Sequence, residues 1–403
     1  MQQRLVIIGA GFAGMYAALS AARLRDSQAV SPDRLEIALL APEPTLVVRP
    51  RLYEPGPERL TAPLQPVLDA IGVTFVPGTA DAVRPGARLI DYRSPGGTER
   101  QLGYDRLVLA TGSRLFRPDI PGLAAFGFSV DSLEDAMALD RHLQGLALRP
   151  RSGARDTVVV AGGGFTGIEV ATEMPARLRA VLGRDAQPRV VIVQRGAAIA
   201  PDMGAAARPH IEQALRELQV ETELDVGVAA LDEAGVVLSD GRRIDTLTVI
   251  WAAGMRAAPL TATIPAERDD LGRLIVDRNL RVPGIAGVFA TGDAAKVPCD
   301  ELGNHALMSC QHATRMGAFA GHNAAADLLG VPGQPYHQET YVTCLDLGEA
   351  GAIFTRGWDR EVELLGAAAK ELKREINTVW IYPPRAERTA ALASADPQRV
   401  TDL

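Results

Sequence analysis

The chain is poor in cysteines, aromatic residues and runs of like charge. Three cysteines (Cys299, Cys310 and Cys344) form no C-x-x-C pair, which excludes a disulfide framework and a four-thiolate metal site and favours a reducing compartment. Aromatic residues are only 5% of the chain, few for an aromatic-rich β-sandwich. The 42 basic and 49 acidic residues give a net charge of −7 without a basic run. We therefore expect a cytoplasmic protein without a nucleic-acid partner.

The longest uncharged run could be mistaken for a membrane span. It covers Leu5 to Ala22, 18 residues, and begins with a four-residue aliphatic stretch. Gly9, Gly11 and Gly14 follow that stretch, as they would where a buried strand turns into a helix. The pattern therefore predicts a strand, a turn and a helix, and no integral membrane span.

The same pattern occurs a second time in the chain. The segments RLVIIGAGFAGMYAA (4–18) and TVVVAGGGFTGIEVA (157–171) both run from an apolar strand through G-x-G-x-x-G into a helix. Each is followed by a second β-rich run (35–44 and 188–196) and later by an apolar strand that ends at Gly112 or Gly254. The shared order predicts a duplicated nucleotide-binding unit in an α/β fold.

Each glycine loop predicts a site for a dinucleotide. The second glycine lets the backbone approach a pyrophosphate, which then faces the helix N-terminus. The candidate residues are Gly9, Gly11, Phe12, Ala13 and Gly14 in the first loop and Gly162, Gly164, Phe165, Thr166 and Gly167 in the second. Asp293, in the turn after Gly292, would suit an acceptor for a ribitol hydroxyl, although Asp is also common in turns for local reasons.

The order of these motifs resembles the flavoprotein superfamily with two dinucleotide-binding domains, over about residues 4–330. The order is first glycine loop, Ala110-Thr111-Gly112, second glycine loop, A-x-G and Thr291-Gly292-Asp293. Within that superfamily the chain looks most like type II NADH dehydrogenases (NADH:quinone oxidoreductases), on the segments GGGFTGIEVATE (162–173), IWAAG (250–254), RPRLYE (49–54) and SCQHATRMG (309–317).

This resemblance implies an architecture and an activity. We expect two Rossmann-like domains: a discontinuous FAD-binding domain (1–123 and 271–335) and an NAD(P)H-binding domain (124–270), followed by a C-terminal α/β segment (336–403). The implied reaction passes a hydride from NAD(P)H to FAD and electrons on to a quinone-like acceptor. Glu169 would lie at the nicotinamide–flavin contact, although an acid early in a helix is also favourable without a function. Gln311 would lie on the acceptor side. Pro50, Leu52 and Tyr53 would form a flavin-side loop, and Arg49 beside them is a further cofactor-binding candidate.

The chain departs from the family at several of these positions. Ala41 stands where an acid usually binds the adenosine ribose, so either Glu43 substitutes or that contact is lost. In the second unit Gln194, followed by Arg195, replaces the equivalent acid. This favours tolerance of NADPH, and a Gln that merely contacts NADH is the alternative. The acceptor-side segment has Cys310 and Arg315 where the family tends to have Ala and Gln.

The cysteines and histidines bear on the other activities that this fold could have. Residues 1–298 contain no cysteine, which excludes a disulfide reductase and disfavours a sulfide:quinone reductase. Two alternatives stay open: a reductase of a small redox protein of the ferredoxin or rubredoxin type, and an NAD(P)H-sensing flavoprotein resembling apoptosis-inducing factor. The six histidines show no metal-ligand spacing.

The C-terminal residues carry expectations about assembly and location. The family's amphipathic membrane anchor has no counterpart after Pro384, where the helical pattern fades, so we expect a soluble or weakly peripheral protein. The predicted helix 368–380 could cover the acceptor side, pair with a second subunit in a homodimer or touch a membrane. Its modest length and mixed charge favour the first two, with charged residues at Lys370, Glu371, Lys373, Arg374 and Glu375.

Overall fold

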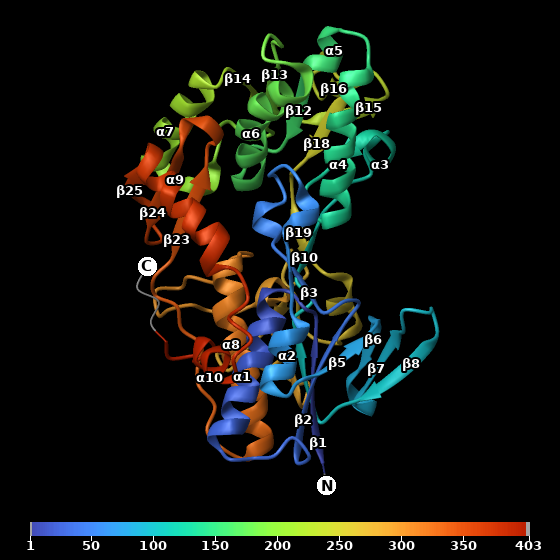
Figure 1. The fold of residues 1–403 in the computed structure, drawn as a ribbon, viewed down its shortest axis with the longest axis vertical. Helices are drawn as coiled ribbons and strands as arrows, with labels where there is room; N and C mark the ends of the chain where they lie inside the picture. The colour runs from blue at the N-terminus through green and yellow to red at the C-terminus, as the bar shows by residue number, and fades with distance from the viewer. Residues whose placement is uncertain (1, 400–403) are drawn as a thin grey trace.

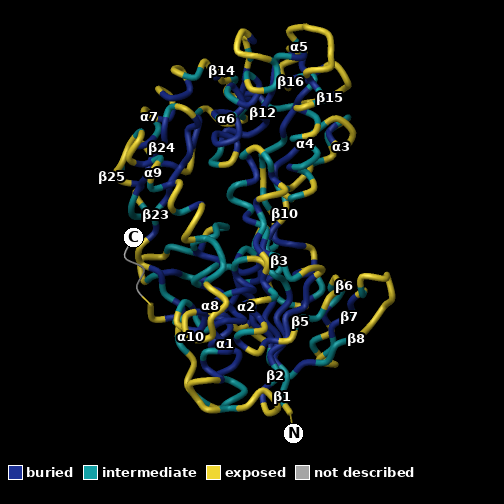
Figure 2. The backbone as a smooth tube through the Cα atoms, in the orientation of Figure 1, coloured by how far each residue is buried: buried dark blue, intermediate teal, exposed yellow. Residues whose placement is uncertain are grey.

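The computed structural model describes residues 2–399 of the chain. Two lobes are stacked along the long axis, each built on a parallel sheet, and the C-terminal segment lies against one side of both lobes (Figure 1). The strands at the centre of each lobe are buried and the loops around them are exposed (Figure 2). Among residues 2–399, no helix combines the length and the apolar character that crossing a membrane requires.

The first lobe is built on a five-stranded parallel sheet in the order β21-β9-β1-β2-β5. Its strands are β1 (Gln3–Ile8), β2 (Leu35–Ala41), β5 (Thr74–Pro77), β9 (Arg106–Leu109) and β21 (Val288–Ala290). The strands read as apolar runs because helices cover parallel sheets on both faces. The lobe also contains α2 (Gln65–Ile71), the hairpin of β3 (Thr45–Val47) and β4 (Thr61–Pro63), and the antiparallel strands β6 (Thr79–Arg84), β7 (Leu89–Arg93) and β8 (Glu99–Gly103).

Two helices of this lobe, α1 (Phe12–Ser27) and α8 (Cys310–Leu329), pack with their backbones almost in contact. A Cβ atom on Gly317 would lie 2.3 Å from the carbonyl oxygen of Ala13, and one on Gly321 would lie 2.0 Å from that of Ala17. This seam places the N-terminal end of α8 beside the first glycine loop.

The second lobe repeats the arrangement. Its parallel sheet has the order β11-β18-β12-β13-β14, so β18-β12-β13 corresponds to β9-β1-β2. The strands are β11 (Gly127–Phe128), β12 (Thr157–Ala161), β13 (Arg189–Val193), β14 (Val220–Glu223) and β18 (Thr248–Trp251), with helices α3 (Leu123–Phe126), α4 (Leu133–Gly145), α5 (Gly153–Asp156), α6 (Phe165–Leu182) and α7 (Gly204–Glu217). A small sheet of β15 (Val228–Asp232), β16 (Gly235–Leu238) and β17 (Arg243–Asp245) completes it. The predicted α/β class and duplicated unit are confirmed.

The chain crosses between the lobes twice, and the two crossings pair with each other. They are β10 (Ser113–Leu115) and β19 (Met255–Ala257), which are antiparallel. After the return, β20 (Leu274–Ile275) pairs with β22 (Ala295–Lys296), and Gly292–Ala294 form a short 3-10 turn. The domain limits given above stay a prediction.

The C-terminal segment is an antiparallel sheet of β23 (Val342–Asp346), β24 (Ala352–Arg356) and β25 (Glu361–Leu365), followed by α9 (Gly366–Glu375) and a π-helical turn at Ile376–Trp380. The expectation that regular structure fades after Pro384 was wrong, because α10 (Arg388–Ser394) buries Ala391 and Leu392 in the core of the first lobe. A seven-residue helix with so few buried apolar side chains has no clear periodic signal.

Candidate active site at the two glycine loops

A cleft of about 2140 Å³ reaches both glycine loops and the C-terminal segment. The predicted site residues that line it are Gly9, Gly11, Phe12, Ala13, Glu43, Arg49, Pro50, Ala110, Thr111, Gly112, Gly164, Phe165, Thr166, Glu169, Asp293 and Gln311. The other predicted residues, which shape the backbone or lie beside the cleft, are Gly14, Gly162, Gly167, Gln194, Arg195, Gly254 and Gly292. The fold therefore brings the two glycine loops, Glu169 and Gln311 to one continuous space.

The three glycines of the first loop are required for different physical reasons. Gly9 has φ +112°, and a Cβ atom there would lie 2.3 Å from the carbonyl oxygen of Ala110. A Cβ atom on Gly14 would lie 1.8 Å from the carbonyl oxygen of Gly9. A Cβ atom on Gly11, at the start of α1, would meet no protein atom within 4 Å. The fold needs Gly9 and Gly14, whereas Gly11 leaves room for a ligand.

The second loop repeats this division. A Cβ atom on Gly167 would lie 1.8 Å from the carbonyl oxygen of Gly162, which itself has φ +121°. A Cβ atom on Gly164, before the first residue of α6, would meet nothing within 4 Å. Both loops thus present a bare helix N-terminus to the cleft, which suits the pyrophosphate of a dinucleotide.

Polar groups without protein partners lie around the first loop. The hydroxyl groups of Thr111 and Thr291 are buried and make no hydrogen bond. Ser113 donates a hydrogen bond of 2.5 Å to Asp293, and Arg49 lies 3.9 Å from the same carboxylate while it pairs with Asp131. Burial raises the pKa of Asp293. Unpaired hydroxyls and a buried carboxylate beside a glycine loop fit a ligand rich in phosphate and hydroxyl groups, as FAD is.

The residues at the ends of β2 and β13 differ in their contacts with the glycine loops. At the end of β2, Ala41 and the exposed Glu43 both line the cleft. After β13, the side-chain oxygen of Gln194 accepts a hydrogen bond of 3.0 Å from the backbone N–H of Gly163. Arg195 is exposed, and its stem packs over Gly227. Gln194 therefore supports the second loop, and Arg195 keeps its charge in solvent.

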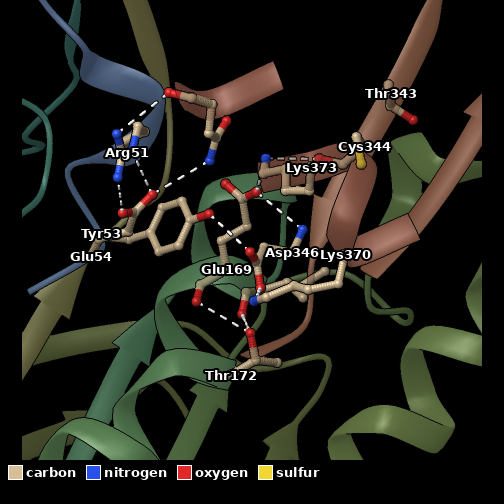
Figure 3. Close-up of polar contacts among 12 residues, drawn as sticks. Arg51, Tyr53, Glu54, Glu169, Thr172, Thr343, Cys344, Asp346, Lys370 and Lys373 are labelled. Carbon is tan, nitrogen blue, oxygen red and sulfur yellow. Dashed lines mark hydrogen bonds and ion pairs between the residues drawn. The ribbon is translucent and has the colours of Figure 1, made fainter. Parts of the chain in front are cut away.

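A buried ion pair lies where α6 meets the C-terminal segment (Figure 3). Lys373 of α9 donates hydrogen bonds to Glu169 (2.7 Å) and to the carbonyl oxygen of Cys344 (2.8 Å). Glu169 also accepts a bond of 3.2 Å from the backbone N–H of Asp346. The pair joins residues 204 positions apart. Sequence reasoning included Lys373 only among the mixed charges of the tail helix, and no local signal identifies it as the partner.

The pair has perturbed ionisation. Burial raises the pKa of Glu169 to about 7, although the charge and hydrogen bond of Lys373 act in the opposite direction. For Lys373, burial lowers the pKa, but the charge and hydrogen bond of Glu169 outweigh burial and raise it. A carboxyl group with a pKa near neutrality, at the wall of a cleft, can hold or release a proton under physiological conditions.

The remaining wall of the cleft comes from α8 and the C-terminal segment. The side-chain oxygen of Gln311 accepts a long hydrogen bond of 3.4 Å from the backbone N–H of Val342. Ile376 and Trp380, at the end of α9, line the cleft, so this helix covers part of the site. No group of three or more His, Cys, Asp or Glu side chains within residues 2–399 is placed to hold a metal ion.

Comparisons with known proteins agree with this geometry. The family model described as pyridine nucleotide-disulphide oxidoreductase matches residues 3–317. An NADH dehydrogenase-like protein of Mycobacterium tuberculosis strain CDC 1551 is 46% identical over 398 residues, 98% of each chain. A type II NADH:quinone oxidoreductase of M. tuberculosis strain H37Rv is 30% identical over 74% of this chain and 67% of its own. The structure of NDH2 from Plasmodium falciparum in complex with NADH covers 98% of both chains, with TM-score 0.78 and 14% identity.

The family match covers more than half of the chain and includes both glycine loops, β10, β19 and the N-terminal end of α8. The resemblance inferred from the motifs is therefore confirmed. The chain belongs to the pyridine nucleotide-disulphide oxidoreductase family.

Proposed function

We propose that the protein is an FAD-dependent NAD(P)H oxidoreductase that reduces a quinone-like acceptor. The observation that carries the proposal is the single cleft shared by two bare helix N-termini, the Glu169–Lys373 pair and the acceptor-side wall of α8 and α9. The M. tuberculosis relative named as a type II NADH:quinone oxidoreductase supports this acceptor class. FAD would bind at the first loop and NAD(P)H at the second, in domains with the limits proposed above.

Bound FAD would supply two-electron chemistry, accepting a hydride from NAD(P)H and passing the electrons to the acceptor. Gly11 and Gly164 would hold the two pyrophosphates at the N-termini of α1 and α6, and Asp293 would accept a hydrogen bond from a flavin hydroxyl group. The overall reaction, NAD(P)H + H⁺ + quinone → NAD(P)⁺ + hydroquinone, consumes one proton. Glu169 can hold that proton at its carboxyl group, since burial brings its pKa to about 7.

A steady-state comparison of acceptors tests the proposal. The purified yellow protein is given NADH or NADPH with a neutral naphthoquinone, a ferredoxin or no acceptor. We expect rapid turnover with the quinone and slow turnover with ferredoxin. Slow turnover with every acceptor, together with a long-lived charge-transfer complex, would instead favour a nucleotide-sensing role.

We also propose a cytoplasmic enzyme, weakly peripheral or homodimeric, on the basis of exposed apolar side chains at the two ends of α9. They are Leu364 and Leu365 on β25, before the helix, and Val379 and Trp380, after it, and Val379 is 62% exposed. Sedimentation with anionic vesicles and size-exclusion chromatography separate the two arrangements, because only the first requires lipid.

A further inference from the structure

A cluster of aromatic and basic side chains, three of which carry an unpaired buried nitrogen atom, lies at the junction of α8, the β24–β25 turn and the second lobe. It comprises His312, Tyr341, Trp358 and Arg360, and is called the Arg360 box below. The Tyr341 and Trp358 rings are stacked at 5.2 Å, the His312 ring lies 4.8 Å from that of Tyr341, and the Arg360 guanidinium lies 4.3 Å above the Tyr341 ring. Tyr341, Trp358 and Arg360 line the cleft.

Three nitrogen atoms of the box have no hydrogen-bond partner within residues 2–399: Nε2 of His312, Nε1 of Trp358 and Nη1 of Arg360. His312 is 0% exposed and Arg360 is 8% exposed. Buried polar groups without partners are rare and costly, and a guanidinium group is costlier than a neutral one. The indole N–H of Trp358 and the guanidinium group of Arg360 can only donate hydrogen bonds, and both residues line the cleft, so these two indicate a ligand that accepts hydrogen bonds.

The β24–β25 turn and the second lobe fix the position of the Arg360 side chain. Arg360 has φ +60°, in the left-handed region that favours glycine. Its Nε donates a hydrogen bond of 3.2 Å to the carbonyl oxygen of Asp202 in the second lobe, which fixes the guanidinium group at the cleft. No carboxylate within residues 2–399 forms an ion pair with Arg360, so its charge is available to an anion. His312 contributes no charge, because burial and then Arg360 lower its pKa to about 3.

Through His312 the box adjoins Gln311 on α8, and through Asp202 it adjoins the segment in which the backbone N–H of Ala200 donates to the carbonyl oxygen of Gly163 in the second glycine loop. A dinucleotide at the second loop already has the N-terminus of α6 for its pyrophosphate. The box also supplies a flat aromatic surface in a chain with only 5% aromatic residues, and all three tryptophans (Trp251, Trp358 and Trp380) line the cleft. Aromatic surface next to an unpaired guanidinium suits a planar ring that carries an acidic group.

We propose that the Arg360 box selects acceptors in which a quinone ring carries an anionic substituent, such as a carboxylate or sulfonate. This inference rests on the proposed function and names its substrate class. The anionic group would pair with Nη1 of Arg360 and accept a bond from Nε1 of Trp358, with the ring beside Tyr341. A neutral quinone would leave both donors unpaired.

The test uses the FAD-loaded full chain with saturating NADH and two acceptors, 2-methyl-1,4-naphthoquinone and 1,4-naphthoquinone-2-sulfonate. The measured quantity is kcat/KM for the sulfonate divided by kcat/KM for the neutral quinone, because the fraction of active enzyme cancels in this ratio. Loss of a charge-assisted hydrogen bond in Arg360→Gln should lower the ratio by roughly 10- to 100-fold, and loss of a neutral hydrogen bond in Trp358→Phe should lower it by roughly fivefold. Arg360→Lys should keep part of the preference.

The matched control is Arg374→Gln, which removes a positive charge on α9 that does not line the cleft; its ratio should stay at the wild-type value. An unchanged ratio in Arg360→Gln, or a wild-type enzyme that reduces only the neutral quinone, overturns the inference and leaves the proposed function standing. A rise in KM for NADH without a change in the ratio would assign Arg360 to the nucleotide instead. A wild-type enzyme that reduces neither quinone refutes the proposed function itself.

Discussion

Replacing Lys373 with methionine should destabilise the protein progressively as the pH rises above 7. Methionine keeps an unbranched side chain in the buried position but removes the charge and both hydrogen bonds of the ammonium group. Glu169 is then left in the protein interior without its cation. In the wild type, the charge and hydrogen bond of Lys373 are the main contributions that hold the pKa of Glu169 down against burial. Their removal must raise that pKa above its present value of about 7.

The magnitude follows from proton linkage. An unfolded Glu has a pKa of about 4.3. Because the folded pKa is raised to about 7, the stability from this group is complete below about pH 4.3 and is lost as the pH rises through the folded pKa. In Lys373→Met the loss continues above pH 7, by about 1.4 kcal/mol per pH unit. Between pH 7 and 9 the variant should lose up to about 2.7 kcal/mol of stability, against about 0.4 kcal/mol for the wild type with its pKa of about 7.

Lys373 itself adds no pH dependence in this range. The pKa of Lys373 is raised, so its contribution to stability is complete below the unfolded value of about 10.4 and is lost only as the pH rises through the folded pKa. The two lost hydrogen bonds add a nearly constant cost of about 1–3 kcal/mol.

The assay is urea denaturation of the FAD-loaded proteins from pH 6 to 9, with flavin release and far-ultraviolet circular dichroism followed together to test for one transition. Lys370→Met is the control, since Lys370 pairs with Asp346 but is 40% exposed; its effect should vary little with pH. The double variant Glu169→Gln/Lys373→Met should remove the pH dependence. A difference between Lys373→Met and wild type that stays constant from pH 6 to 9 would refute the reasoning.

Three further predictions concern the nucleotides. Gly11→Ala should retain the wild-type circular dichroism, because its Cβ meets no protein atom within 4 Å, but should purify without FAD; a yellow variant would contradict this. Gly164→Ala should block reduction of the flavin by NADH but not by dithionite, and bleaching by NADH at the wild-type rate would reverse the site assignment. The wild type should use NADPH at least as well as NADH. Gln194→Glu should keep the bond from Gly163 but repel a 2′-phosphate, at about 1 kcal/mol after screening, and Arg195→Ala should weaken NADPH more than NADH. A hundredfold preference for NADH that Gln194→Glu leaves unchanged would show that these side chains do not face the ribose.

The two strand–loop–helix units could be predicted from local sequence because their constraints are local. Parallel strands buried on both faces need continuous apolar runs, and Gly9 and Gly14 contact one another within a few residues of chain. Repetition of this pattern 153 positions later (4 to 157) made the duplicated fold, and the two loops proposed as nucleotide sites, predictable without coordinates. The resemblance of the motifs then indicated the family, and Glu169 and Gln311 as candidates.

The partners of those candidates were decided only by the tertiary structure. Lys373 reaches Glu169 because α9 docks against β23 and β23 packs on α6, which brings together residues 204 positions apart that no periodicity connects. The same docking brings the β24–β25 turn to the second lobe, where Arg360 meets the backbone of Asp202 and the rings of the Arg360 box. Burial is also a property of the whole fold, and it raises the pKa of Glu169 to about 7. The sequence by itself therefore determined the backbone shape of the two glycine loops, the proposed dinucleotide sites, because contacts within each loop specify that shape. The packing of the C-terminal segment determined which charges are buried, which are paired and which stay available to a ligand, because desolvation depends on every element around a side chain.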